Sequence, residues 1–250
     1  MTNPPGFGAG TRLAFNCPLS SGRADRLAAD LAAHRPATVV DFGCGWGELL
    51  LRVVEAAPGS HGTGLEIFAP DVERGRQAAA KRGLTDRVTF VESPAAAYTA
   101  PADVVISVGA YQAFGTVAEA LTAIRARVNP GGRVLFAAEI WEYTPSAEQL
   151  ANMWPGMKLE DCLYLPDLVD EAVAAGFRPL RIQTSNRDEW EEFESGYLLS
   201  TEEWLLANPG HPEAESRRER ADAHRKISLR GARGVFGFAF LTLGVWESRD

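Results

Sequence analysis

Residues 39–50 read Val-Val-Asp-Phe-Gly-Cys-Gly-Trp-Gly-Glu-Leu-Leu, and this stretch decides the fold. A short apolar run ends in Asp41, glycines follow at alternate positions 43, 45 and 47, and an amphipathic helix begins after them. Glycine permits left-handed turns and removes the side chain that would keep a ligand away from the backbone. The free N–H groups at the start of a helix then face the ligand. The stretch therefore predicts a strand, a glycine loop and a helix that together hold a ligand.

The spacing of these glycines differs from the two common nucleotide-binding fingerprints. A dinucleotide site needs glycine or alanine three residues after Gly45, and Glu48 stands there. A P-loop needs Gly-Lys followed by Ser or Thr, which the stretch lacks. Trp46, between two glycines, is unsuited to an open phosphate cradle. We therefore expect a different ligand, and a dinucleotide enzyme of similar architecture stays as the alternative.

The segment Asp41-Phe-Gly-Cys-Gly-Trp-Gly47 resembles the first motif of class I S-adenosylmethionine-dependent methyltransferases. Further elements, similar to the second to fifth strands of that family, follow in order: residues 61–66, 87–92, 103–109 and the strand after Asn129-Pro130-Gly131-Gly132. The resemblance covers residues 20–140 well and the rest more loosely, and it is nearest to bacterial small-molecule enzymes with a helical cap. It implies S-adenosyl-L-methionine as cofactor and S-adenosyl-L-homocysteine as product.

The resemblance also implies which residues hold the cofactor. Glu66 lies where the family places the carboxylate that binds both ribose hydroxyls, because a carboxylate accepts from two donors. The family usually carries an acid for the adenine amino group after its third strand. Pro94 stands there, without a side-chain acceptor, so either Glu92 or backbone and apolar contacts replace it. The full set expected at the cofactor is Asp41, Gly43, Cys44, Gly45, Glu66, Ile67, Glu92, Ser93 and Gly109.

Strand and helix patterns alternate from about residue 37 to 184, which predicts an α/β fold with helices on both faces of a sheet. We expect a doubly wound, mostly parallel seven-stranded sheet, the Rossmann-like methyltransferase fold. Residues 179–184 and 235–245 are similar to the sixth and seventh strands of the family, and the analogy inserts the seventh antiparallel between the fifth and sixth. Helices are expected at 21–33, 47–57, 70–82, 116–128 and 166–175.

We expect residues 1–250 to form one methyltransferase domain. Its predicted parts are an N-terminal helical segment (1–35), a cofactor-binding core (36–184), a helical cap (185–234) and the last strand (235–250). The cap is predicted because a connection this long is usually structured. Its aromatic residues Trp190, Phe193, Tyr197 and Trp204 recur at near-helical spacing, and a charged helix follows the break at 208–212. The aromatic residues either pack the cap or line a substrate pocket.

Methyl transfer from a sulfonium chiefly requires alignment of the reacting atoms, and a base only where the acceptor must lose a proton. The acceptor is expected beyond the carboxyl ends of the fourth and fifth strands, as in open parallel sheets. Tyr111 and Glu139 are the candidate catalytic residues, although Tyr111 packing and Glu139 pairing with a neighbour are the alternatives. The predicted substrate contacts are Tyr111, Gln112, Trp141, Tyr143, Trp190 and Tyr197. No metal site is predicted.

Composition limits the partners of the chain. A net charge of −8 argues against broad nucleic-acid binding, and no run approaches the length of a membrane span. The three cysteines have no metal-binding spacing and the N-terminus has no signal-peptide pattern, so we expect a cytoplasmic monomer or homodimer. The sequence thus predicts a methyltransferase acting on an O, N or C atom of a small-molecule acceptor. The alternatives are a cofactor-binding regulator or cyclase that does not methylate, and a macromolecule methyltransferase.

Overall fold

The computed structural model describes residues 3–6 and 10–247. They fold into two compact units that interleave along the chain. Unit 1 takes the described residues up to Leu19, together with Ile140–Tyr164 and Ser185–Gly237. Unit 2 takes Ser20–Glu139, Leu165–Thr184 and the described residues from Phe238 onward. The predicted cap segment thus groups with residues near the N-terminus and with the end of the fifth strand, and its role as a cap stays a prediction.

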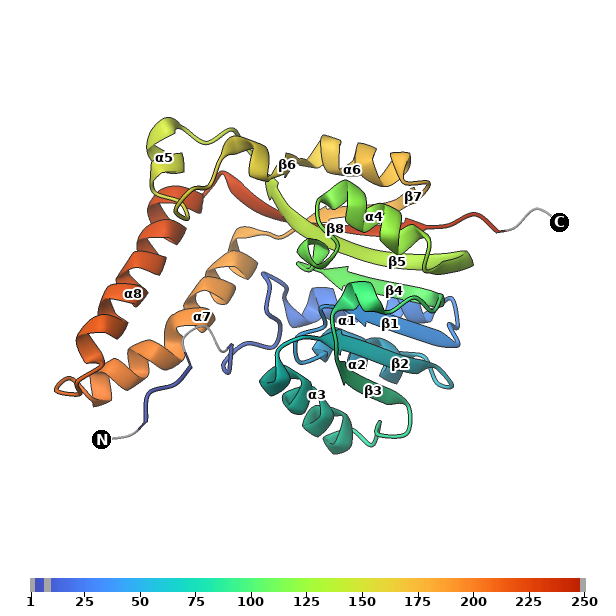
Figure 1. The fold of residues 1–250 in the computed structure, drawn as a ribbon, viewed down its shortest axis with the longest axis horizontal. Helices are drawn as coiled ribbons and strands as arrows, with labels where there is room; N and C mark the ends of the chain where they lie inside the picture. The colour runs from blue at the N-terminus through green and yellow to red at the C-terminus, as the bar shows by residue number, and fades with distance from the viewer. Residues whose placement is uncertain (1–2, 7–9, 248–250) are drawn as a thin grey trace. The chain divides into compact units, whose positions relative to one another are not determined.

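Unit 2 is built around a sheet in the order β3-β2-β1-β4-β5-β8-β7 (Figure 1). The strands are β1 (Thr38–Phe42), β2 (His61–Glu66), β3 (Val88–Glu92), β4 (Ala102–Val108), β5 (Val128–Trp141), β7 (Arg178–Thr184) and β8 (Phe236–Gly244). β1 to β5 pair in parallel, and β8 pairs antiparallel with β7. The predicted fold and the insertion of the last strand between the fifth and sixth are confirmed. The short β6 (Leu163–Tyr164) pairs with the end of β5 as an eighth strand.

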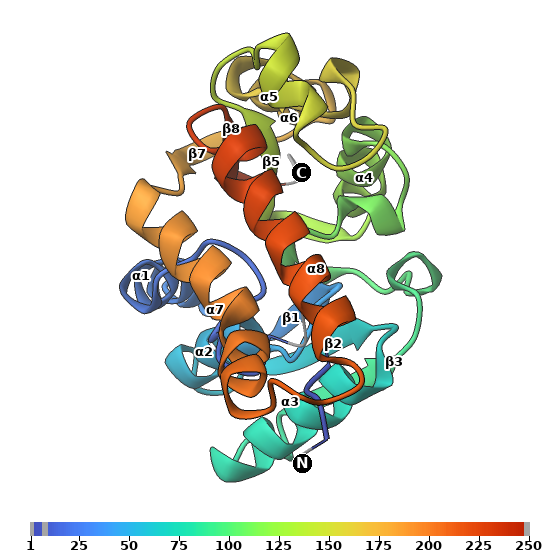
Figure 2. The ribbon, with the colours of Figure 1, turned by 90° about the vertical axis from the view of Figure 1, so that its left-hand side faces the viewer.

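The helices of unit 2 form two packed groups. Their bounds are α1 (Ser21–Ala32), α2 (Glu48–Ala56), α3 (Ala69–Lys81), α4 (Val117–Arg125) and α6 (Leu165–Ala174). α2 packs against both α1 and α3 (Figure 2), and α4 packs against α6. The predicted helices are confirmed to within a few residues. α4 ends earlier than expected because Val128 is already the first residue of β5.

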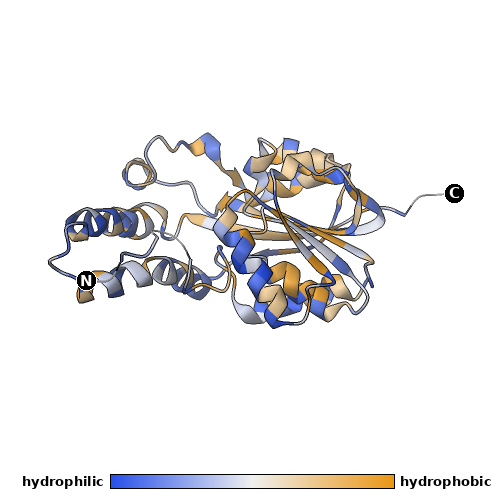
Figure 3. Ribbon diagram, turned by 60° about the horizontal axis from the view of Figure 1, so that its bottom comes forward, coloured by the Kyte–Doolittle hydropathy of each residue, from blue (hydrophilic) through white to orange (hydrophobic). Residues whose placement is uncertain are grey.

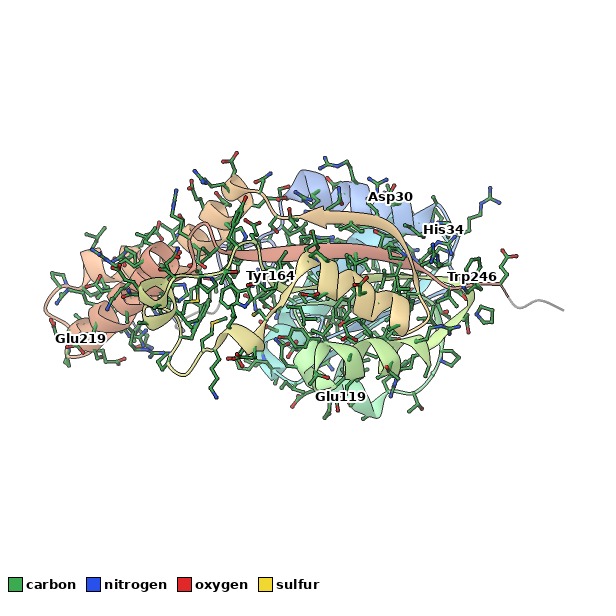
Figure 4. The ribbon with its side chains drawn as sticks, turned by 90° about the horizontal axis from the view of Figure 1, so that it is seen from above. Asp30, His34, Glu119, Tyr164, Glu219 and Trp246 are labelled. Carbon is green, nitrogen blue, oxygen red and sulfur yellow. The ribbon has the colours of Figure 1, made fainter. Side chains whose placement is uncertain are left out.

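The core of unit 2 lies along its central strands, which are coloured hydrophobic for much of their length in Figure 3. Residues 104–106 of β4 and 134–138 of β5 are 0 % exposed. Both faces of the sheet are covered: Figure 4 shows Asp30 of α1 and the following His34 on one side of the strands and Glu119 of α4 on the other. Parallel strands covered on both faces read as continuous apolar runs, as these do.

The segment Asn129-Pro130-Gly131-Gly132 corrects one prediction. We expected a turn that precedes the fifth strand, but the segment lies inside β5 as an irregular stretch. The partners of β4 and β5 shift from Ala102↔Val128 to Val104↔Arg133, so β5 carries extra residues there. Pro130 lacks an N–H for the ladder and Gly131 adopts a φ of +76°, and both are typical of a bulge.

Unit 1 contains the helical pair α7 (Arg187–Ala207) and α8 (Ala214–Lys226), followed by a π-helical segment, η4 (Ile227–Ala232). This confirms the two helices expected after the sixth strand. The ring of Tyr197 stacks on His224 at 4.6 Å, and Glu194 lies 2.8 Å from the same histidine. Gly196 of α7 leaves room for Leu13, which explains how the N-terminal residues join this unit.

Among residues 3–6 and 10–247, every helix is too short or too polar to cross a lipid bilayer.

Candidate active site

The glycine loop lies between β1 and α2, as the sequence predicts. Gly43, Gly45 and Gly47 have φ values of +66°, +54° and +69°, the left-handed region that favours glycine. A Cβ on Gly43 would lie 2.5 Å from the Cβ of Ala110, and one on Gly47 would lie 2.2 Å from the ring of Phe90. A Cβ on Gly45 would meet no atom within 4 Å. Two glycines thus satisfy internal packing, whereas the third presents bare backbone to open space.

Glu66, at the end of β2, is fixed against this loop. Its Oε2 accepts a hydrogen bond from the backbone N–H of Gly45 at 3.0 Å. Its Oε1 accepts from the N–H groups of Ile67 at 2.8 Å and Phe68 at 3.0 Å. A carboxylate offers about four acceptor positions, so these three bonds leave capacity for an external donor. The backbone bonds hold the carboxylate in one orientation at the carboxyl end of the strand.

Two exposed apolar side chains follow Glu66. Ile67 is 70 % exposed and Phe68 is 55 % exposed, although both stand beside a polar loop. The N–H of Ser93 donates to the carbonyl of Glu66 at 3.0 Å, which ties the end of β3 to the same place. Glu92 pairs with Glu66 in the strand register and is exposed. The predicted residues at the ends of β2 and β3 therefore come together, next to an apolar surface.

Burial and the charge of Glu66 act on the two titratable groups of the loop, Asp41 and Cys44. Burial, with the charge of Glu66, raises the pKa of Asp41 well above its ordinary value. Burial and the charges of Asp41 and Glu66 raise the pKa of the Cys44 thiol above its usual range. The Sγ of Cys44 would lie 2.8 Å from a Cβ on Gly64, so this side chain packs against β2. Cys44 thus contributes backbone to the loop, while its thiol stays protonated and unreactive.

The candidate catalytic residues lie at the carboxyl ends of β4 and β5. Gly109 directly follows β4 and has a φ of +64°, and Tyr111 begins the short helix η2 (Tyr111–Ala113) just after it. Val108 is the register partner of Ala137, so Glu139 extends beyond the same edge of the sheet. Burial raises the pKa of Glu139, and its Oε2 has no hydrogen-bond partner among the described residues. The predicted pair thus shares one edge of unit 2.

The predicted substrate contacts divide between the units. Gln112 is exposed in unit 2, whereas Tyr143, Trp190 and Tyr197 belong to unit 1. Trp141 is 1 % exposed, and its indole N–H donates to the carbonyl of Leu159 at 2.8 Å. Trp141 therefore packs in the core of unit 1, and its position gives no support to a substrate contact.

Two residues near the glycine loop were not predicted from the sequence. Phe68 follows Glu66 and Ile67, and only its exposure in the folded chain identifies it as a candidate site residue. The guanidinium carbon of Arg74 lies 3.7 Å from the centroid of the Trp46 ring. The position of Arg74 one turn into α3 carries no motif, so only the folded chain shows the contact.

This chain is similar to known proteins in its sequence, including the glycine loop, and in its fold. The profile of a family described as a methyltransferase domain matches residues 40–134. The uncharacterized protein YjhP of Escherichia coli (strain K12) is 28% identical over 212 residues, which are 84% of this chain and 85% of the relative.

Two solved structures have the same fold over nearly the whole chain. A SAM-dependent methyltransferase from Geobacter sulfurreducens, in complex with S-adenosyl-L-homocysteine, has a TM-score of 0.84 at 25% identity and covers 95% of each chain. One from Thiobacillus denitrificans, also in complex with S-adenosyl-L-homocysteine, has a TM-score of 0.84 at 26% identity and covers 97% of this chain and 99% of that chain. Together with the fold and the glycine loop, the methyltransferase-domain match and these two structures support a class I S-adenosylmethionine-dependent methyltransferase.

Proposed function

We propose that unit 2 binds S-adenosyl-L-methionine at the carboxyl ends of β1, β2 and β3, and that the enzyme transfers the methyl group to an O, N or C atom of a small-molecule acceptor. The observation that carries this proposal is the bond between Gly45 and Glu66. It joins the exposed backbone of the loop to a fixed carboxylate at 3.0 Å. S-adenosyl-L-homocysteine in the two similar enzymes supports the same ligand class.

The residues present fit an adenosyl sulfonium. Glu66 would accept from the ribose hydroxyls, and the exposed side chains of Ile67 and Phe68 would pack on the adenine. The open space at Gly45 would take the part of the ligand that runs along the loop. The negative charge of Glu66 favours a cationic ligand and disfavours the pyrophosphate of a dinucleotide.

When bound, the cofactor supplies an already activated methyl group. We assign Tyr111 and Glu139 to the acceptor because they share the carboxyl edge of β4 and β5. The raised pKa of Glu139 suits a group that takes a proton from an acceptor hydroxyl or amine near neutral pH. Tyr111 would orient the acceptor. Transfer to a small molecule, rather than to a macromolecule, is supported by the net charge of −8.

The first experiment is a calorimetric titration of the full chain with S-adenosyl-L-methionine, S-adenosyl-L-homocysteine and NAD. Saturable binding of the first two at about micromolar concentration, and none of NAD, is the expected result. Binding of NAD, or of none of the three, would reject the proposal. Release of S-adenosyl-L-homocysteine with a candidate acceptor then separates a methyltransferase from a protein that binds the cofactor without methylating.

Glu66→Ala tests the central contact. We expect it to weaken binding of S-adenosyl-L-homocysteine by about 1–3 kcal/mol, the cost of leaving buried donors without an acceptor. Glu73→Ala is the matched control, because Glu73 is an exposed carboxylate on α3. Equal affinities of the two variants for S-adenosyl-L-homocysteine would show that Glu66 does not contact the ligand.

A further inference from the structure

A pocket lies within unit 1 and shares no residue with the glycine loop. It has a volume of about 590 Å³, within the range of small-molecule sites. The first turns of α7, the segment η4 and the start of β8 line it. The segment η4 is π-helical. Such segments are rare in proteins, and those that occur often lie at functional sites.

Aromatic side chains form one wall of this pocket. The rings of Trp190 and Phe236 lie 5.9 Å apart, and both belong to the lining. Phe236 is held from behind by Trp141 at 5.5 Å and by Trp154 at 5.4 Å. The indole N–H of Trp190 is buried and has no acceptor among the described residues. A buried donor of this kind normally has a partner, so an acceptor from outside these side chains would stabilise the wall.

One carboxylate of the lining has no cation of its own. Glu142 lines the pocket and forms no ion pair with a described residue, and burial raises its pKa. A Cβ on Gly237 would lie 2.5 Å from the Cγ of Glu142 and 2.9 Å from its Oε1. The glycine in β8 therefore makes the room in which the Glu142 side chain is seated.

The other charges of the lining leave an excess of carboxylate. Arg233 is neutralised by Glu191 at 2.6 Å. Glu194 lies 2.8 Å from His224, and Arg187 is exposed at the first residue of α7. A cation that enters the pocket would thus be attracted by Glu142 and Glu194 and repelled only by the exposed guanidinium of Arg187. Aromatic faces also attract cations.

We propose that this pocket binds an organic cation with a flat apolar part, with the cation at Glu142 and the flat part against Trp190 and Phe236. The ligand class follows from one unpaired carboxylate beside an aromatic wall. The inference does not depend on the cofactor proposed for unit 2.

Tyramine and tyrosol test the proposal, because they differ only in an ammonium against a hydroxyl. The protein is labelled with fluorotryptophan, and Trp190→Phe identifies the Trp190 signal in fluorine NMR. We expect tyramine to shift the Trp190 signal and leave that of the exposed Trp246 unchanged. We also expect tyramine to bind about tenfold more tightly than tyrosol, the scale of a partly desolvated cation–aromatic and carboxylate contact.

Glu142→Gln should abolish the preference for tyramine, whereas Glu192→Gln should retain it. Glu192 is an exposed carboxylate on α7, the helix that carries Trp190, and lies outside the lining, which makes it the matched control. Equal binding of the two probes, a preference that survives Glu142→Gln, or no shift up to about 10 mM would overturn the proposal. Titration of S-adenosyl-L-homocysteine into the same variants keeps this result separate from the cofactor proposal, since both variants should bind it as the parent does.

Discussion

The three glycines of the loop share one backbone conformation but have different surroundings. All have a positive φ, so any replacement is strained. At Gly43 the added atom would also meet Ala110, whereas at Gly45 it would enter open space. The same substitution therefore acts on packing at one position and on the proposed ligand space at the other.

Gly43→Ala and Gly45→Ala should separate these two effects. Backbone strain costs each variant about 1–2 kcal/mol of unfolding free energy, and overpacking costs Gly43→Ala about 1–3 kcal/mol more. Urea unfolding measures the loss of stability, and calorimetric titration with the cofactor measures the loss of ligand space. We expect Gly43→Ala to be the less stable variant, and Gly45→Ala to lose cofactor affinity while it stays folded. Equal loss of stability in both would contradict the packing argument.

The buried carboxyl of Glu139 makes the stability of the protein depend on pH. Its pKa in the folded chain is raised above the ordinary value of 4.5, so the folded state retains the proton after the unfolded state has lost it. The contribution of this group to stability therefore falls as pH rises from about 4.5 to the raised value. Glu139→Gln removes that penalty.

We expect the melting temperature of Glu139→Gln, relative to the parent, to increase between about pH 4 and about pH 8. Glu119→Gln should show the opposite trend. Hydrogen bonds from Thr116 lower the pKa of Glu119, so its contribution is present at high pH and lost on acidification. Differential scanning calorimetry measures both, between about pH 4 and pH 8 for Glu139→Gln and below about pH 5 for Glu119→Gln, because the lowered pKa of Glu119 places its change below the ordinary value of 4.5. A pH-independent difference for Glu139→Gln would show that the carboxyl is solvated.

At the scale of elements, one carboxylate joins the helices on one face of the sheet. Glu48 begins α2, and its Oε1 accepts from Arg52 at 2.8 Å. Its other oxygen pairs with Arg82 at the end of α3. Arg52 also reaches Asp25 of α1 at 2.7 Å. The acid that replaces the glycine of a dinucleotide fingerprint therefore has a structural role, because it connects three helices behind the loop.

Glu48→Ala should destabilise the protein by about 2 kcal/mol, between the values for exposed and buried ion pairs. The side chain of Glu48 is 15% exposed, and its removal leaves Arg52 and Arg82 without it. Glu55→Ala is the control, because Glu55 is 43% exposed and makes one bridge to Arg82. It should cost about 0.5 kcal/mol in the same urea unfolding measurement. Equal costs would mean that the network adds nothing beyond a surface pair.

At the scale of the whole molecule, the two units share strands. β5 continues from unit 2 into unit 1 at Ile140, and β8 passes from unit 1 into unit 2 at Phe238. Unit 1 is assembled from three separate stretches of chain. Neither unit is therefore a contiguous segment that the chain can fold by itself.

We expect the two units to unfold in one cooperative transition. Trp141, Trp154, Trp190 and Trp204 lie in unit 1, so tryptophan fluorescence reports chiefly on it, whereas far-ultraviolet circular dichroism reports on the helices and strands of both. The urea midpoints from the two signals should coincide. A lower midpoint by fluorescence would show that unit 1 opens first.

The sequence, with its resemblance to the methyltransferase family, was sufficient for the glycine loop, the helices of unit 2 and the order of seven strands, but the short β6 was not predicted. Periodicity, capping residues and glycine spacing depend on neighbours within a few positions, and these patterns survive without knowledge of the fold. The resemblance to the methyltransferase family pointed to Glu66, which is the last residue of β2. The irregular stretch inside β5 was missed because Pro130 and Gly131 also suit a turn.

Tertiary structure decided which side chains meet. Several features bring together residues that are distant in sequence: Gly43 close to Ala110, Arg74 over Trp46, and Glu142 beside Gly237. The burial of Trp141 likewise depends on distant parts of the chain. The grouping of the N-terminal residues and Ile140–Tyr164 with α7 and α8 belongs to the same class. Such contacts depend on strand register and on close packing between elements, and local sequence patterns contain neither.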